Sequence, residues 1–531
     1  MNRRHFLQTG GAMVLAAATA RCRKTAGLTP FRNIEEASIA ELQSAMQRGN
    51  ATASSLTLFY LDRIGRLDKN GPKLRAVIET NPDALSDALR LDEERMEKGP
   101  RGPLHGIPVL IKDNIDTADR METTAGSLAL VGSPVGRDAF VVRRLREAGA
   151  VILGKTNLTE WANFRSTRST SGWSGRGGLT RNPYALDRSA SGSSSGSAVA
   201  VSANLCAAAV GTETDGSVTS PSSVNGIVGI KPTLGLISRS GIIPIAHSQD
   251  TAGPMARTVS DAAVLLGVMA GTDPDDGSTL ESASRGKTDY TRFLDPDGLR
   301  EARIGLARNL FGFHDRVDAL MDEAVGVMRR CGAVVVDPVE VPNTDELGEL
   351  EWDILLYEFK ADLNAYLAKR RAKPHARSLE ALIAFNHAHR DAEMPYFGQE
   401  IFTKSQAKGP LTEKAYLLAL ERARRLSRRE GIDAVLRKHR LDAVAAPTDP
   451  PAWVTDLVDG DHYLGGTTTP AAVAGYPHVT LPMGFVFGLP VGVSFFSGAW
   501  SEPKLIRIAY AFEQASRARK PPRFLPSVKM D

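Results

Sequence analysis

Two serine-rich loops and one lysine carry the residue types that nucleophilic chemistry needs. A glycine–serine cluster, Ser-Ala-Ser-Gly-Ser-Ser-Ser-Gly-Ser, occupies 189–197, and Gly-Thr-Glu-Thr-Asp-Gly-Ser follows at 211–217. Upstream, Lys112 ends the apolar run 106–111. Burial disfavours the charged form of lysine and lowers its pKa from ~10.4, which would make Lys112 a usable base near neutral pH. The alternative is a surface lysine paired with Asp113 or Asp116.

The cluster at 189–197 has three interpretations. A flexible linker should be bordered by polar sequence, yet this segment leads straight into the apolar stretch 198–210, which we expect to be a buried helix. A tight loop at a helix N-terminus instead directs backbone N–H groups at an anion or a developing oxyanion. A phosphate cradle is disfavoured because the lysine and threonine that a P-loop needs after its glycines are absent.

The second loop predicts a nucleophile at Ser217. Glycine at 216 permits close backbone approach, and the N–H groups of Thr214, Asp215, Gly216 and Ser217 are candidates for an oxyanion hole. No histidine is nearby in the sequence and the Gly-x-Ser-x-Gly elbow is absent, so a serine–lysine arrangement is the fitting solution. The carboxylate of Asp215 is unexplained, since it opposes an oxyanion unless its side chain turns away.

Composition excludes several classes of protein. The chain has 531 residues, 42% of them apolar and 24% charged, with a formal net charge of +4, so it is a large globular protein with no charge argument for a nucleic-acid partner. Three cysteines are too few for a disulfide scaffold, and the ten histidines show no metal-ligand pattern. We expect no metal and no cofactor.

The N-terminus predicts export. Arg3 and Arg4 precede a short apolar region that ends in Ala-Thr-Ala at 18–20, an order typical of a twin-arginine signal peptide over 1–20 and of a periplasmic or secreted protein. The alternative is an uncleaved anchor. The longest later apolar run, 198–210, has 13 residues and falls short of a membrane span.

The remaining pattern predicts one large α/β domain over 30–525, with a central mixed sheet covered by helices on both faces. Its core is expected at about 75–270 and 440–520, and a charged, helix-rich cap or insertion at about 345–430. Expected helices cover 34–47, 53–67, 84–98, 140–147, 317–328 and 504–518, and expected strands cover 107–111, 151–153, 227–230, 303–307, 334–336, 441–447, 479–482 and 491–496.

Several motifs in order resemble the amidase signature family over nearly the whole mature chain. They are His-Gly-Ile-Pro-Val-Leu-Ile-Lys-Asp-Asn at 105–114, Thr-Thr-Ala-Gly-Ser at 123–127, Gly-Lys-Thr-Asn-Leu-Thr-Glu-Trp-Ala-Asn at 154–163, Ser-Gly-Ser-Ser-Ser-Gly-Ser-Ala at 191–198, the loop at 211–217 and Gly-Ile-Lys-Pro-Thr at 229–233. The wording is most similar to bacterial peptide amidases, which remove ammonia from C-terminal peptide amides.

The resemblance implies a Ser–Ser–Lys triad. Ser217 matches the nucleophile, Ser193 the bridging serine with a cis bond to Gly192, and Lys112 the base. The N–H groups at 214–217 match the oxyanion hole, and an acyl-enzyme is the expected intermediate. The chain departs from the commonest family wording at Ser191, Ser195, Asp215 and Thr219; the last stands where many members have arginine.

Three alternatives stay open from the sequence. Aryl or aliphatic amides, rather than peptide amides, are a further substrate class for the same chemistry. An amidotransferase A-type subunit would be cytoplasmic and work with partner subunits, which an export signal opposes. A non-catalytic binding protein is disfavoured because the three triad positions are intact.

Overall fold

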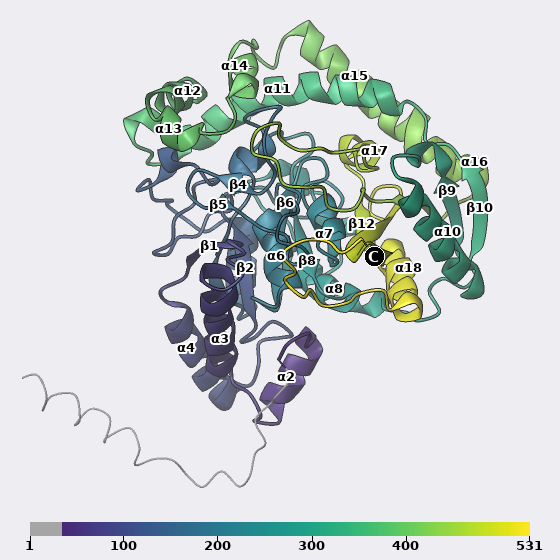
Figure 1. Ribbon diagram of the computed structural model, residues 1–531, viewed down its shortest axis with the longest axis horizontal. Helices are drawn as coiled ribbons and strands as arrows, with labels where there is room; N and C mark the ends of the chain where they lie inside the picture. The colour runs from purple at the N-terminus through teal and green to yellow at the C-terminus, as the bar shows by residue number, and fades with distance from the viewer. Residues whose placement is uncertain (1–33, 531) are drawn as a thin grey trace, which may run out of the picture.

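An eleven-stranded mixed sheet forms the centre of the protein in the computed structural model, which describes residues 34–530 (Figure 1). β2 runs parallel to both β3 and β6, whereas β8 is antiparallel to β6 and β7. From edge to edge the order is β1 (Val77–Thr80), β3 (Val151–Thr156), β2 (Pro108–Lys112), β6 (Ala208–Glu213), β8 (Thr251–Ala256), β7 (Val228–Lys231), β12 (His478–Val486), β13 (Leu489–Phe496), β11 (Ala443–Pro447), β9 (Arg303–Ala307) and β10 (Val334–Val339).

Helices cover both faces of this sheet, as predicted. α6 and α7 contact each other and the central strands, while α8, α10 and α18 form a second connected group against the sheet. The helices before α11 and after α17 are α2 (Ile39–Gln47), α3 (Ala53–Arg63), α4 (Ala84–Lys98), α5 (Phe140–Glu147), α6 (Ser195–Ser202), α7 (Thr219–Val224), α8 (Val259–Met269), α9 (Ser282–Arg285), α10 (Asp315–Arg330) and α18 (Glu502–Ser516). A small two-stranded sheet pairs β4 (Trp173–Ser174) with β5 (Gly178–Leu179).

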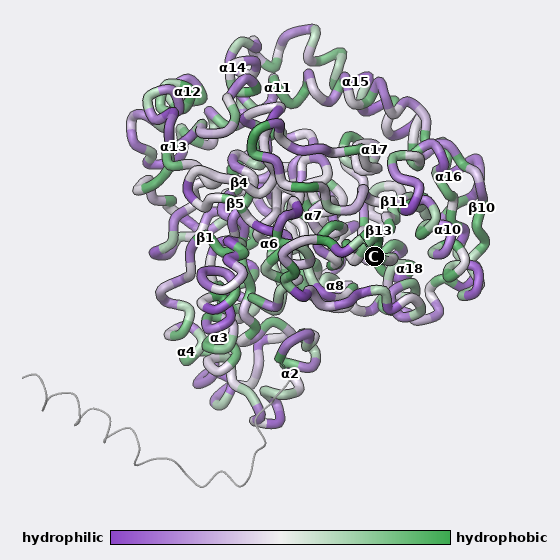
Figure 2. Tube along the Cα trace, viewed as in Figure 1, coloured by the Kyte–Doolittle hydropathy of each residue, from purple (hydrophilic) through white to green (hydrophobic). Residues whose placement is uncertain are grey.

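The helical region predicted at 345–430 arches over one edge of the sheet in Figure 1, where α11 and α15 pack side by side. An apolar cluster, which includes Phe164, Phe359 and Phe402, joins this cap to the loops before β4. The remaining helices are α11 (Thr344–Lys369), α12 (Leu379–Ala388), α13 (Arg390–Glu393), α14 (Glu400–Gln406), α15 (Lys414–Ser427), α16 (Asp433–His439) and α17 (Thr469–Ala474). Hydrophilic stretches recur along its outer helices in Figure 2.

The expected helix over 198–210 is wrong in its second half. α6 ends at Ser202, the backbone turns through Asn204 at a φ of 57°, and β6 begins at Ala208. Cys206 therefore lies in the buried turn and not in a helix. A short run of alanine and valine that is buried on every side has no period to distinguish helix from strand. The two serine loops thus flank a helix–strand unit.

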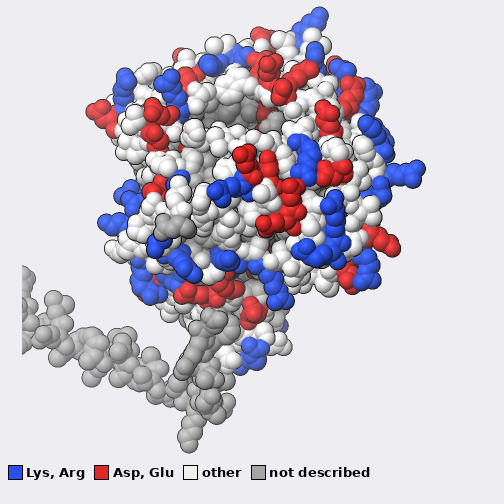
Figure 3. Space-filling model, turned by 45° about the vertical axis from the view of Figure 1, so that its right-hand side comes forward, with Lys and Arg blue, Asp and Glu red and all other residues white. Residues whose placement is uncertain are grey.

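The formal net charge of the chain is only +4. Acidic and basic side chains are interspersed on the face shown in Figure 3. Within residues 34–530, no helix is both long and apolar enough to cross a membrane. The predicted signal segment at 1–20 lies outside the described residues.

Candidate active site

Lys112 is fully buried at the end of β2 and is surrounded by hydroxyl groups. Its Nζ hydrogen-bonds Ser193 Oγ at 2.8 Å, Ser194 Oγ at 2.9 Å and Thr212 Oγ1 at 2.9 Å, and it donates to the Thr212 carbonyl at 3.2 Å. The alternative of a surface lysine is therefore wrong. Asp113, its expected partner in that alternative, instead accepts hydrogen bonds from Thr124 and Gly126.

This environment favours a neutral amine. No residue within 34–530 forms an ion pair with Lys112, and burial lowers its pKa well below the ordinary value, although Glu213 and Asp250 partly oppose the shift from a distance. A neutral amine has two N–H donors and one lone pair. Hydroxyl groups can satisfy all three, because each both donates and accepts. The structure therefore confirms that Lys112 is desolvated, and its role as the base stays a prediction.

The sheet register places Lys112 beside the first serine loop. Lys112 pairs with Thr156 of β3, and paired residues on neighbouring strands share a face. The Thr156 hydroxyl lies 2.7 Å from that of Ser197 in α6, which shows that this face of the sheet meets α6. Ser193 and Ser194 immediately precede α6. The pairing of β2 with β3 therefore places Lys112 next to these two serines.

The backbone before α6 is tightly enclosed. The Gly192–Ser193 peptide bond is cis, in agreement with the feature that the resemblance implied. A Cβ atom at position 192 would lie 2.2 Å from Thr159 Oγ1, so only glycine fits there. The Thr159 N–H donates to the Ser193 carbonyl at 3.1 Å. The cluster is therefore a fixed loop and not a linker.

The second loop leaves β6 and is held from behind by Glu213. The buried Glu213 Oε2 accepts hydrogen bonds from the N–H groups of Val218 and Thr219 and from the Thr219 hydroxyl, at 2.7, 2.9 and 3.1 Å. Thr219 thus anchors the turn; its side chain is fully buried and does not line the cleft beside these loops. Gly216, with a φ of 73°, is the one position in the turn that needs a left-handed backbone.

The two loops are joined by one backbone hydrogen bond, from Ser194 N–H to the Ser217 carbonyl at 3.1 Å. The Ser217 side chain has no hydrogen-bond partner among residues 34–530, and the residue is 8% exposed. The structure therefore brings Lys112 into direct contact with Ser193, while Ser217 lies beside this pair without a hydroxyl–hydroxyl hydrogen bond to it. Catalytic contacts of this kind often tighten only when substrate binds.

The backbone N–H groups predicted for the oxyanion hole are available. Within the described part of the chain, no acceptor bonds the N–H groups of Asp215, Gly216 or Ser217. The Thr214 N–H group has no acceptor there either, and the Thr214 hydroxyl separately donates to Asp250 Oδ1 at 2.5 Å. Unpaired backbone donors in a buried turn are the groups that a developing oxyanion requires.

A cleft of about 530 Å³ opens next to these loops. It reaches Gly192 and Gly216, which directly precede the two expected catalytic serines, and it continues between the loop at 163–171 and the cap. Its aromatic lining consists of Phe164, Trp352, Trp453 and Tyr463. The cap expected at about 345–430 thus contributes Trp352 and Ile401 to the cleft.

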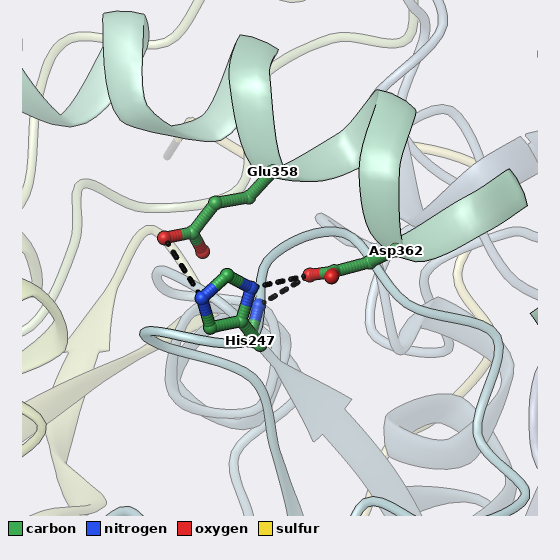
Figure 4. Close-up of side chains that lie close together, drawn as sticks. All are labelled: His247, Glu358 and Asp362. Carbon is green, nitrogen blue, oxygen red and sulfur yellow. Dashed lines mark hydrogen bonds and ion pairs between the residues drawn. The ribbon is translucent and has the colours of Figure 1, made fainter. Parts of the chain in front are cut away.

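Sequence reasoning missed the cluster of His247, Glu358 and Asp362 (Figure 4). The imidazole lies between the two carboxylates of α11, with Nδ1 2.9 Å from Asp362 and Nε2 3.5 Å from Glu358. These are the only residues within 34–530 whose grouping could hold a metal ion. Their oxygens are engaged, since Glu358 also accepts from Tyr416 OH and the Ser248 N–H. The cluster ties the segment before β8 to the cap.

Ser194, Thr212 and Asn114 were also missed as members of the site. Thr212 contacts Lys112 through its hydroxyl and carbonyl, and Asn114 Nδ2 donates to the same hydroxyl at 3.0 Å. All three lie inside the motifs at 105–114, 191–198 and 211–217. Their place in these motifs was a signal, but only the pairing of β2 with β6 shows that they converge.

Comparison with known proteins defines the class to which this fold and site belong. The family model described as Amidase matches residues 55–506, and the chain belongs to this family. It is therefore an amide-hydrolysing enzyme built on a single large α/β domain.

Three relatives show which members of this family the chain resembles. The native peptide amidase of Stenotrophomonas maltophilia is 54% identical with a TM-score of 0.89, over 93% of this chain and 99% of that one. A probable amidase of Arabidopsis thaliana is 44% identical over 93% of this chain and 92% of its own length. One of the subunits of the glutamyl-tRNA(Gln) amidotransferase of Pseudomonas aeruginosa is 33% identical over 91% of this chain and 98% of its own length.

Proposed function

We propose that the protein hydrolyses C-terminal peptide amides to the acid and ammonia through a Ser217–Ser193–Lys112 triad. The observation that carries this proposal is the 2.8 Å contact of a buried lysine, free of ion pairs among the described residues, with the hydroxyl of Ser193. The 54% identity to a peptide amidase supports the substrate class. The size and aromatic lining of the cleft suit a peptide better than a small aliphatic amide.

In the first half of the reaction, Ser217 Oγ bonds to the carbonyl carbon of the amide. Its proton passes to Ser193, whose own proton passes to neutral Lys112, so that no charge is left on either serine. The N–H groups of 214–217 hold the oxyanion; such a donor typically contributes ~2.7–4 kcal/mol to the transition state. Lys112 then returns the proton through Ser193 to the leaving nitrogen, and ammonia departs from an acyl-enzyme.

In the second half, water takes the place of Ser217. It attacks the acyl carbon and delivers a proton along the same path to Lys112. Collapse of the second tetrahedral intermediate breaks the bond to Ser217 Oγ, which recovers its proton, and releases the carboxylic acid. The lysine ends each half in its starting form, so one base serves both steps.

A substrate panel tests the function. Purified enzyme without partner proteins should release ammonia from peptide amides faster than from aliphatic or aryl amides, and Ser217→Ala should lower turnover by at least about 10⁴-fold while circular dichroism stays unchanged. Failure on every peptide amide would exclude this substrate class. Hydrolysis that needs partner subunits and a charged tRNA would support the amidotransferase alternative. An active Ser217→Ala variant would contradict the mechanism.

We further propose that the enzyme is exported through the signal at 1–20, on the basis of the twin arginines and the Ala-Thr-Ala site at 18–20. Cell fractionation should find the mature chain outside the cytoplasm. Replacement of Arg3 and Arg4 by lysine should retain the full-length chain in the cytoplasm. Equal export of both forms would contradict a twin-arginine route.

A further inference from the structure

The side chain of Asp215 turns away from the oxyanion loop and meets the cap. Asp215 lies two residues before Ser217, and its Oδ2 accepts a hydrogen bond from the Thr469 hydroxyl of α17 at 2.6 Å. Its carboxyl group also lies next to that of Glu351 on α11, close enough for a hydrogen bond when one of the two is protonated. Two carboxyl groups therefore meet between the catalytic loop and the cap helix, at a place where the commonest family wording has glycine.

Gln249 connects this pair to the backbone of the loop. Its Nε2 donates to Glu351 Oε1 at 2.6 Å and to the Thr214 carbonyl at 3.3 Å. The Thr214 carbonyl belongs to the same peptide plane as the Asp215 N–H. A bond that fixes this carbonyl therefore also fixes the direction of an N–H group expected to hold the oxyanion. The His247 cluster, two residues away, ties the same segment to α11.

The hydrogen bonds account for one proton on the pair. The Thr468 hydroxyl lies near the Asp215 carboxyl group, but among residues 34–530 no hydrogen bond of normal geometry reaches the buried Asp215 Oδ1. Because Glu351 Oε1 already accepts from Gln249, a proton on the other oxygen of Glu351 is the donor that Asp215 Oδ1 lacks. Burial and the nearby charge of Asp215 raise the pKa of Glu351 well above its usual range, which agrees with this assignment.

Other titratable groups surround the pair. Lys231 on β7 favours the ionised form of Asp215, and burial lowers the pKa of this lysine to about 8. Glu213 on β6 and Asp449, after β11, oppose a further negative charge. The remaining neighbours are Thr468, Thr469, Gln249 and Tyr463, whose hydroxyl donates to Asp449. Glu213 and Asp449 thus favour retention of the shared proton, and Lys231 opposes it less because burial lowers the pKa of this lysine.

We propose that Asp215 and Glu351 share one proton and together act as the positioning pair that holds the oxyanion loop against α11. The proposal rests on the proposed amidase function. With the proton present, the pair carries one negative charge, which Thr469 and Glu351 both stabilise. Loss of the proton places a second negative charge beside the N–H groups that must stabilise an oxyanion, and it breaks the contact that holds the loop.

The test compares Glu351→Gln with Glu351→Ala. Glutamine reproduces protonated glutamate, since its carbonyl accepts from Gln249 and its amide donates to Asp215, but it cannot lose a proton. We expect Glu351→Gln to stay within about 3-fold of the wild-type kcat. Glu351→Ala should lose about 10- to 100-fold in kcat with little change in KM, less than the ~10²–10³-fold cost of removing an oxyanion donor outright. Asp353→Asn, at a partly exposed ion pair on the same helix, is the matched control and should match wild type.

The pH profile separates a shared proton from a merely structural contact. Wild-type kcat should decline at alkaline pH as the pair loses its proton, and this decline should be absent in Glu351→Gln. A decline that persists unchanged in Glu351→Gln, as titration of Lys231 would produce, overturns the proposal. So does a wild-type profile without an alkaline decline, or a glutamine variant as impaired as the alanine variant.

All variants are compared as ratios to wild type on an amide that the wild type hydrolyses. Absence of wild-type hydrolysis would refute the proposed function before the carboxyl pair is tested. Thermal denaturation confirms that each variant is folded at the assay temperature. If Glu351→Ala is unfolded, the comparison of the pH profiles of wild type and Glu351→Gln decides by itself.

Discussion

Lys112 and Lys155 occupy neighbouring positions in the same sheet and have different surroundings. Both are fully buried, and Lys155 pairs with Ile111, the residue before Lys112, so the two side chains leave opposite faces of the sheet. Lys112 meets hydroxyl groups next to α6. Lys155 donates to the Ile115 carbonyl at 2.6 Å and the Thr123 hydroxyl at 2.8 Å.

The charges around the two lysines explain why their pKa values are lowered to different extents. Burial lowers the pKa of both, but four carboxylates act against this at Lys155: Asp113, Asp116, Asp119 and Glu79. Lys112 has only the distant Glu213 and Asp250, and its pKa falls further. Burial therefore favours a neutral lysine most where few carboxylates lie close enough to oppose the loss of its charge.

The largest expected effect comes from exchanging each lysine for methionine. Lys112→Met should lower kcat by about 10³–10⁴-fold, because the general base is lost, and leave a folded protein. Lys155→Met should cost about 1–3 kcal/mol of stability, because the Ile115 carbonyl loses a donor, while the folded fraction keeps the wild-type pH–rate profile. Steady-state kinetics and urea denaturation measure both. Comparable loss of kcat in the two variants would remove the distinction between them.

A second prediction concerns stability and pH. The unfolded chain holds the lysine proton up to ~10.4, whereas folded Lys112 releases it at lower pH, so the free energy of unfolding should rise with pH between these values by about 1.4 kcal/mol per unit. Lys112→Met should abolish this contribution, and Lys155→Met should remove a smaller one. Denaturation at a series of pH values from 6 to 10 measures the slopes. A wild-type slope retained in Lys112→Met would mean that Lys112 is charged in the folded state.

The smallest effect is expected from Thr212→Val. Valine has the shape of threonine but removes one hydroxyl from Lys112, which stabilises the ammonium less and lowers its pKa further. The ascending limb of the kcat profile should move to lower pH by less than about one unit, since one hydrogen bond contributes about 1 kcal/mol. Ser197→Ala, which alters the next hydroxyl pair along the sheet, is the control. A shift to higher pH would contradict the role given to the hydroxyl groups.

Local patterns predicted most of the elements. α4 and α5 begin and end at the predicted residues, because amphipathic spacing and a glycine stop are both local signals; Gly149, just after α5, has a φ of 79°. The stretch 198–210 was mispredicted because its uniform apolar character contains no period. The pairing of β2 with β6 could not be predicted either, since these strands begin 100 residues apart in the chain, at Pro108 and Ala208.

The sequence by itself determined the family and predicted Lys112, Ser193 and Ser217 as the reacting groups, because the motifs around them are contiguous and chemically specific. Only the tertiary structure decided which of several buried lysines meets hydroxyl groups, and where Asp215 points. The physical reason is that protonation depends on the polar partners around a group, and these arrive from β2, β6 and α11, which are distant in the chain. From the sequence, the carboxylate of Asp215 is expected to disfavour an oxyanion nearby. In the fold, its side chain turns away from the loop and lies next to Glu351.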